Sequence, residues 1–278
     1  MVTVSEERVR VEIGANGVAT VTLARADKHN ALDQPMFEGL INAAEQLASD
    51  VTVRAVVIHG EGKSFCSGLD VASFMTRGGG TDVLLIRKGG ELANFAQRVT
   101  CDWSRVSAPV IAAIHGNCFG GGLQIALGAD IRLAAPSARL SILEIKWGLI
   151  PDMGITQTLP RLLPIDVAKE LTFTGRIVSG SEGCDLGLIT RVNDDPLAAA
   201  LTLADDIARQ SPDAIRAAKR LYNETWTGNN SAAALVLETD LQVGILGKPN
   251  QIAAITAGMQ GKRAIFGNPE WSSPEVRE

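Results

Sequence analysis

The chain opens with two segments in which apolar and polar residues alternate. RVRVEI (residues 8–13) and VATVTLA (residues 18–24) have the two-residue period of half-buried strands, and GANG between them supplies a glycine-containing turn. The pattern predicts a β-hairpin. In the next segment, QPMFEGLINAAEQLA (residues 34–48), the apolar residues fall at helical spacing and Pro35 is tolerated in the first turn. This segment predicts an amphipathic helix.

Buried strands and helices then alternate along the chain. VRAVVIHG and APVIAAIHG, about fifty residues apart, are short, apolar and rich in β-branched residues, which is typical of strands in a parallel sheet. Between them, TDVLLIRKGGELANFAQRVTCDWSRV predicts a long helix weakened at Gly89 and Gly90, and the preceding TRGGG predicts a mobile loop. Further strand-like segments, IRLAA, ARLSI and LITRVN, follow down to residue 193. The repeated strand–helix–strand units predict an α/β fold.

The pattern changes at Asp195, after which three segments predict helices. They are PLAAALTLADDIARQ, SPDAIRAAKRLYNETW and SAAALVLETDLQVGIL, and Ser211 with Pro212 forms a capping and first-turn signal. We therefore divide the chain into a core, residues 1–194, and a helical C-terminal region, residues 195–278. The broad apolar faces of these helices need a partner surface, which is either another subunit or the core of the same chain.

Composition and charge exclude several classes of protein. The 278 residues are 46% hydrophobic and 4% aromatic, with one Tyr and a net charge of −5, so we expect an aliphatic globular core and no nucleic-acid partner. The N-terminal segment is too polar for a signal peptide, and no apolar run reaches the ~18 residues of a membrane span, so we expect a cytoplasmic protein without a membrane partner. The four Cys and three His are scattered, which predicts reduced cysteines and no metal site.

Two glycine-containing segments resemble nucleotide-binding loops without satisfying their spacing. VVIHGEGKS has Val57 where a P-loop needs its first glycine, and GNCFGGG has Ile125 where a dinucleotide-binding turn needs its third. The sequence therefore predicts neither a phosphate loop nor a nicotinamide cofactor.

SFCSGLD (residues 64–70) and FGGGLQ (residues 119–124) each follow a buried strand and each precede a predicted helix. Such turns expose backbone N–H groups, and two converging donors would stabilise an enolate oxyanion, each worth on the order of 10²–10³ in rate. The alternative is that the glycines only permit tight turns.

Taken together, these segments resemble the crotonase (enoyl-CoA hydratase/isomerase) superfamily. SFCSGLD resembles its F-x-x-G-x-D segment, AAIHGNCFGGGLQIALGADIRLAA its second signature, and EIKWGLIPDMGITQTLPRLL the region of its acid/base residues. ADKHNALD and GKRAIFG resemble further segments, so that the likeness runs from about residue 8 to residue 268 in family order.

The resemblance implies an α/β fold made of a spiral of ββα units, with a helical C-terminal region that forms trimers, often paired as hexamers. It also implies an acyl-CoA substrate, with CoA as part of the substrate and no separate cofactor. The thioester carbonyl would lie between the N–H groups of Leu69 and Gly121. Further implied substrate contacts are Lys28, Ser67, Gly68, Asp70 and Gly120, together with Lys262 and Phe266 from the tail of the same or a neighbouring subunit; surface solvation is the alternative for the lysines.

The implied acid/base residues decide between reactions. Family hydratases carry two glutamates, at the positions of Glu144 and Gln124, and an amide at 124 cannot exchange a proton at neutral pH. Family dienoyl-CoA isomerases carry Glu and Asp where this chain has Glu144 and Asp152, with an additional acidic residue where it has Gln124. Two carboxyl groups in an apolar pocket would raise the pKa of at least one of them.

Double-bond isomerisation is therefore the favoured activity. The alternatives are a hydratase in which Glu144 acts while Gln124 orients water, and a weakly catalytic acyl-CoA-binding protein. For Asp152 alone, two further roles remain open, namely a cap on the following helix and the nucleophile of a dehalogenase-like reaction.

Overall fold

A computed structural model describes residues 7–76, 82–87, 89–228 and 230–270. Its main sheet has six strands in the order β1-β2-β3-β4-β6-β9, in which β1 and β2 form an antiparallel hairpin and all other neighbours are parallel. The strands are β1 (Val9–Ile13), β2 (Val18–Leu23), β3 (Ala55–Gly60), β4 (Val110–Ile114), β6 (Ile131–Ala134) and β9 (Arg191–Val192). The predicted hairpin and parallel strands are confirmed.

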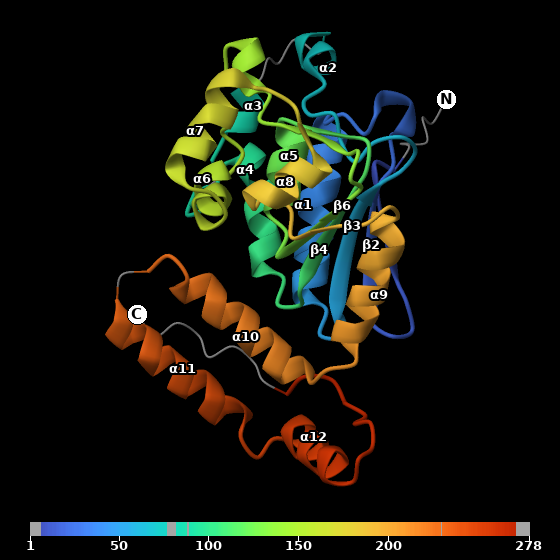
Figure 1. The fold of residues 1–278 in the computed structure, drawn as a ribbon, viewed down its shortest axis with the longest axis vertical. Helices are drawn as coiled ribbons and strands as arrows, with labels where there is room; N and C mark the ends of the chain where they lie inside the picture. Colours follow the sequence, from blue (N-terminus) through green and yellow to red (C-terminus); the bar gives the residue numbers. More distant parts are fainter. Residues whose placement is uncertain (1–6, 77–81, 88, 229, 271–278) are drawn as a thin grey trace.

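Helices cover both faces of this sheet (Figure 1). On one face, α1 (Gln34–Ser49), α4 (Phe95–Cys101) and α5 (Gly121–Leu127) enclose the larger core. On the other face, α9 (Pro196–Ala208) packs its buried alanines against β2, β3, β4 and β6. The helix α9 therefore belongs to the body of the molecule, although it lies in the segment that the sequence assigns to the helical C-terminal region.

A second, three-stranded sheet lies beside the first. It consists of β5 (Asn117–Phe119), β7 (Arg139–Ser141) and β8 (Val178–Ser179), with β7 in the middle. The remaining elements of the body are η1 (Ala26–Lys28), α2 (Val71–Thr76), α3 (Asp82–Leu85), η2 (Asp102–Arg105), η3 (Glu144–Trp147), α6 (Ile155–Thr158), η4 (Leu159–Arg161), α7 (Ile165–Thr174) and α8 (Gly180–Leu186).

The predicted long helix between β3 and β4 is wrong. The structure has two short helices, α3 and α4, separated by a turn that contains Gly89 and Gly90. The second helix begins anew with a capping box in which Asn94 and Gln97 bond each other's backbone N–H groups. The predicted mobile loop falls largely on residues 77–81, which lie outside the described residues.

The helices α10 (Pro212–Thr225), α11 (Ser231–Ile245) and α12 (Pro249–Met259) extend away from the body (Figure 1). The buried Lys219 of α10 anchors them, because its Nζ lies 2.7 Å from Asp130 Oδ2 and donates to the carbonyl oxygens of Trp103 and Ala108. Ser211 occupies the N-cap position of α10 as predicted, but its side chain makes no capping hydrogen bond. The sequence pattern did not predict α12. In the described part of the chain no helix has the length and apolarity needed to cross a membrane.

Candidate active site

A short parallel ladder positions the two predicted oxyanion donors. Cys66 pairs with Cys118 in parallel register, Cys66 N–H donates to Asn117 O (3.1 Å), and Phe119 N–H donates to Cys66 O (3.0 Å). Beyond this pair the two segments stay close, since a Cβ atom built on Gly68 would lie 3.7 Å from the amide nitrogen of Gly121. Neither the Leu69 nor the Gly121 N–H group donates to an acceptor within the described residues. The two turns thus present two N–H groups without partners in the described part of the chain.

Glycine at position 68 makes this close approach possible. Gly68 has φ +91°, and a Cβ atom built on it would lie 2.8 Å from the carbonyl oxygen of Phe119 and 3.7 Å from the amide nitrogen of Gly121. An L-residue at this position would be strained and would separate the two segments. Gly68 therefore acts through the backbone, which is the role that the oxyanion interpretation requires.

The backbone of Leu32 fixes the Leu69 turn from the other side. Leu32 N–H donates to Gly68 O (2.8 Å), and Asp70 N–H donates to Leu32 O (3.0 Å). Asn30, which is fully buried, holds the preceding loop, since its Nδ2 donates to the carbonyl oxygens of residues 61, 64 and 65. The Asn in the family-like N-A-L segment is thus a scaffold for the turn that presents the Leu69 N–H.

The Arg25 side chain links the loop around Ala31 to the Leu69 turn by an ion pair and a hydrogen bond. Its Nη1 lies 2.8 Å from Asp70 Oδ2 and 3.0 Å from Ala31 O, and its Nε lies 3.6 Å from Asp33 Oδ2. The other oxygen of Asp70 accepts the N–H of Ser73 (3.1 Å). Both oxygens of Asp70 are therefore engaged within the protein, so the predicted contact of Asp70 with substrate has no support in this geometry. The sequence analysis missed Arg25.

We expect Arg25→Met to weaken both the fold and the predicted oxyanion hole. Removing the guanidinium leaves Asp70 without its ion-pair partner, so we expect roughly 3 kcal/mol less free energy of unfolding and about a tenfold lower kcat. Urea denaturation and steady-state kinetics test this. Arg10→Met, in an exposed pair with Glu61 at 3.4 Å, is the matched control and should change neither quantity appreciably. An unchanged kcat in Arg25→Met would show that Arg25 does not position the Leu69 turn.

Glu144 begins η3 and faces the start of α5. Its Oε1 accepts a hydrogen bond of 2.6 Å from Gln124 Nε2, and it would lie 3.4 Å from a Cβ atom built on Gly120. Its Oε2 is buried and has no hydrogen-bond partner within the described residues. The structure therefore brings Glu144, Gln124 and Gly120 together, with one carboxylate oxygen unengaged.

The surroundings of Glu144 favour its protonated form. Burial raises its pKa, nearby backbone N–H groups and the hydrogen bond from Gln124 oppose this rise, and the Asp152 carboxylate adds to it. Such a carboxyl group exchanges protons closer to neutral pH than an ordinary glutamate, which suits a general base.

Asp152 lies in the loop between η3 and α6 and is more exposed than Glu144. Partial burial raises its pKa, and its negative charge contributes to the raised pKa of Glu144. It does not cap α6, because the N-cap residue of that helix is Gly154 and no side chain forms a capping hydrogen bond there. This geometry gives the capping role of Asp152 no support.

Gln124 is almost completely buried, with 1% of its surface exposed. Its Oε1 accepts the N–H of Met153 (2.9 Å), while its Nε2 donates to Glu144. The amide is thus engaged at both ends inside the protein, and the predicted role in orienting water has no support in this arrangement.

The predicted CoA-contact residues fall into two groups. Lys28 and Ser67 lie next to the Leu69 turn, where Ser67 Oγ donates to Lys28 O (3.4 Å) and the Lys28 side chain is exposed. Phe266, by contrast, lines a hollow of about 520 Å³ together with Arg54 and the β1–β2 turn, at the opposite end of the parallel strands. Lys262 lies in the same tail segment. These two residues are not part of the same-chain site, and their contribution to a neighbouring subunit stays a prediction.

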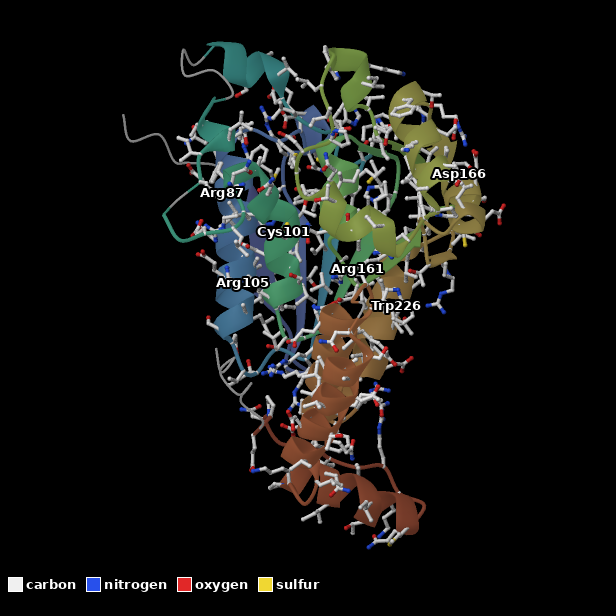
Figure 2. The ribbon with its side chains drawn as sticks, turned by 90° about the vertical axis from the view of Figure 1, so that its left-hand side faces the viewer. Arg87, Cys101, Arg105, Arg161, Asp166 and Trp226 are labelled. Atoms are coloured by element: carbon white, nitrogen blue, oxygen red, sulfur yellow. The ribbon has the colours of Figure 1, made fainter. Side chains whose placement is uncertain are left out.

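A hollow of about 920 Å³ lies between α4, α6 and α10 and not at the carboxylates. Figure 2 shows Arg87, Cys101, Arg161 and Trp226 on this side of the molecule, and all four line the hollow. None of the predicted acid/base or oxyanion residues lines it. Among the described residues, no group of three or more His, Cys, Asp or Glu side chains is arranged to hold a metal ion.

Comparisons with known proteins identify the family of this chain. The family model for enoyl-CoA hydratase/isomerase matches residues 14–263. The mitochondrial Delta(3,5)-Delta(2,4)-dienoyl-CoA isomerase of Mus musculus is 35% identical over 221 residues, which are 77% of this chain and 68% of that protein. The mitochondrial methylglutaconyl-CoA hydratase of Homo sapiens is 35% identical over 232 residues, 81% of this chain and 66% of that protein.

Solved structures show the same fold. The enoyl-CoA hydratase of Bacillus anthracis superposes with a TM-score of 0.83 at 28% identity, over 94% of this chain and 100% of that one. The enoyl-CoA hydratase of Mycobacterium tuberculosis superposes with a TM-score of 0.82 at 26% identity, over 95% and 100%. The resemblance seen in the sequence is confirmed, and the chain belongs to the enoyl-CoA hydratase/isomerase, or crotonase, superfamily of enzymes.

Proposed function

We propose that this protein moves a double bond in a conjugated dienoyl-CoA thioester, with Glu144 and Asp152 as the two proton-transfer groups. The observation that carries the proposal is that one amide, Gln124, bonds both Glu144 and the N–H of Met153, the residue after Asp152, while both carboxyl groups have raised pKa values. The dienoyl-CoA isomerase of Mus musculus is one of the relatives that support it.

The proposed reaction needs only the substrate and the exchange of protons with water. Glu144 Oε2 takes a proton from one end of the conjugated system, and the electron pair of the broken C–H bond delocalises into a dienolate. The N–H groups of Leu69 and Gly121 stabilise the negative thioester oxygen. Once Glu144 is neutral, Asp152 takes up a proton from water and delivers it at the far end, which leaves the double bonds shifted. Glu144 then releases its proton to water, and both carboxylates are restored.

Water addition is the second candidate. The relatives include a methylglutaconyl-CoA hydratase. Oε2 of Glu144 is buried but has no hydrogen-bond partner among the described residues, so it could take a proton from a water molecule that reaches it. In that reaction Glu144 would act alone, and Asp152 would be dispensable.

Parallel assays of a 2-enoyl-CoA and a 3,5-dienoyl-CoA separate the candidates. Dienoyl isomerisation, read by ultraviolet absorbance and product mass, should be lost in Asp152→Asn as well as in Glu144→Gln. Hydration that survives Asp152→Asn but needs Glu144 would overturn the isomerase proposal in favour of the hydratase. Acyl-CoA binding with no turnover of either substrate would identify a weakly catalytic binding protein.

The raised pKa of Glu144 predicts the pH dependence of proton abstraction. The base form is lost as pH falls through this pKa, so we expect the acid limb of kcat/KM above the ordinary glutamate value of about 4.3. In Asp152→Asn the repulsion from Asp152 disappears, which lowers the pKa of Glu144 and moves the acid limb to lower pH. Exchange of substrate hydrogen with deuterated water, followed by mass spectrometry, measures this step even if isomerisation is lost. An acid limb that does not move would place Asp152 outside the field of Glu144.

We also propose that the protein assembles as a trimer or a hexamer. Large apolar side chains of α10, α11 and α12 are exposed in the single chain, among them Trp226, which follows α10, Val243 and Ile255. Their burial against a second copy would remove them from water.

A further inference from the structure

One buried amide connects three separate segments of the active site. Gln124 lies on α5, donates from Nε2 to Glu144 Oε1 at 2.6 Å on η3, and accepts at Oε1 from the Met153 N–H at 2.9 Å in the loop before α6. A carboxamide that is bonded at both ends in a buried site has a single orientation, because turning it over would place an N–H against another N–H and an oxygen against a carboxylate.

The two oxygens of Glu144 are therefore not equivalent. Oε1 is held by a short hydrogen bond to a charged acceptor, which stabilises negative charge on that side. Oε2 is buried without a partner among the described residues. The arrangement leaves Oε2 as the atom that picks up and returns the proton.

The same amide also positions the chain next to Asp152. The Met153 N–H belongs to the peptide unit that begins with the carbonyl carbon of Asp152, so the bond to Gln124 Oε1 fixes that peptide plane. Gln124 thus restrains the Glu144 side chain directly and the Asp152 backbone through its neighbour.

We propose that Gln124 is a positioning residue that holds the two carboxylates in a fixed relation and confines proton transfer to Oε2 of Glu144. The proposal rests on the function proposed above, since it assigns a role to Gln124 within that reaction. It differs from the role in which Gln124 contacts water or substrate, because here the amide acts only through Glu144 and Met153.

Gln124→Met keeps the length of the side chain and removes both hydrogen bonds. We expect kcat to fall about 10- to 100-fold with KM changed less than threefold, because the carboxylates lose their alignment while the binding surface stays. The acid limb of kcat/KM should move to higher pH, because the hydrogen bond from Gln124 lowers the pKa of Glu144. Gln157→Met is the matched control, since Gln157 is exposed on α6 and, within the described residues, its side chain bonds only Thr156, at 3.2 Å; its kinetics should match wild type.

A second readout does not need turnover. In protein labelled with ¹³C at glutamate carboxyl carbons, the signal assigned to Glu144 by its absence in Glu144→Gln should titrate at higher pH in Gln124→Met than in wild type. Gln124→Glu, which places a second carboxyl group beside Oε1, should raise that midpoint further. If Gln124→Met is poorly folded, the titration of Gln124→Glu decides.

An unchanged titration midpoint for Glu144 in both Gln124 variants would overturn the inference, whatever the activity. If Glu144→Gln retains full turnover, the proposed function fails, and the titration still reports on the hydrogen bond. If Glu144→Gln is inactive but Gln124→Met keeps wild-type kcat and acid limb, only the positioning role is wrong.

Discussion

Glu144→Gln is expected to lower kcat about 10³-fold for the preferred acyl-CoA substrate, because an amide at this position cannot take up a proton. The replacement keeps the size of the side chain, and the new carbonyl oxygen can still accept from Gln124 Nε2, so binding of substrate should change little. We therefore expect KM within about threefold of wild type. Steady-state kinetics with dienoyl-CoA and enoyl-CoA substrates measure both constants.

The same substitution should not destabilise the protein at neutral pH. The fold raises the pKa of Glu144, so the folded state disfavours the carboxylate once pH exceeds the unfolded pKa. At pH 7 the neutral amide removes this penalty, and the free energy of unfolding should be equal or higher than in wild type. At pH values below the unfolded pKa both forms are neutral and the difference should disappear. Residual kcat within threefold of wild type would exclude Glu144 as the proton-transfer group.

Gly122→Ala is expected to damage both the fold and the catalytic geometry. Gly122 is the second residue of α5, and a Cβ atom there would overlap the carbonyl oxygen of Cys66 and lie 2.8 Å from the Cys66 Cβ. The helix would have to move away from the ladder that aligns Leu69 with Gly121. We expect about 1–3 kcal/mol less free energy of unfolding, and a loss of kcat on the order of 10²-fold from the displaced donors.

Gly258→Ala is the matched control for this replacement. Gly258 lies in α12, and a Cβ atom there would meet nothing within 4 Å. Since alanine favours a helix over glycine, stability should be unchanged or slightly higher, with kcat unchanged. Denaturant titration and kinetics on both variants provide the comparison, and wild-type kcat in Gly122→Ala would refute the link between the close helix packing and the oxyanion donors.

The sequence predicted best those elements whose burial produces a regular pattern of apolar residues along the chain. The β-hairpin and the buried parallel strands alternate or run apolar over their whole length, so local pattern and tertiary environment agree. The long helix before β4 failed because Gly89 and Gly90 end one helical segment and Asn94 starts another, a cap signal inside an otherwise helical pattern. The side chains of Trp103, in η2, and Phe37, in α1, both lie in the larger core.

The parts of the candidate site that consist of backbone turns could be predicted from sequence motifs. Contacts between side chains that are distant in the sequence were harder to predict. The turns around Leu69 and Gly121 carry a local glycine signal. The ion pair between Arg25 and Asp70 spans 45 positions of the chain and leaves no periodic trace. The sequence excluded proton exchange by Gln124. Only the three-dimensional structure shows that its amide bonds Glu144 and the N–H of Met153.

The parallel pairing of Cys66 with Cys118 has a consequence for how this site can vary and be redesigned. Two residues separate each of these cysteines from its donor, Leu69 on one side and Gly121 on the other. Adding or removing one residue in either interval would displace one N–H relative to its counterpart by up to about 3.8 Å, the spacing of consecutive Cα atoms, which exceeds the tolerance of a hydrogen bond. The side chain at position 69, however, supplies no part of the donor. The spacing of these segments is therefore intolerant of insertions and deletions, while the Leu69 side chain, which packs against the larger core, could be replaced by another apolar side chain without loss of the N–H donor.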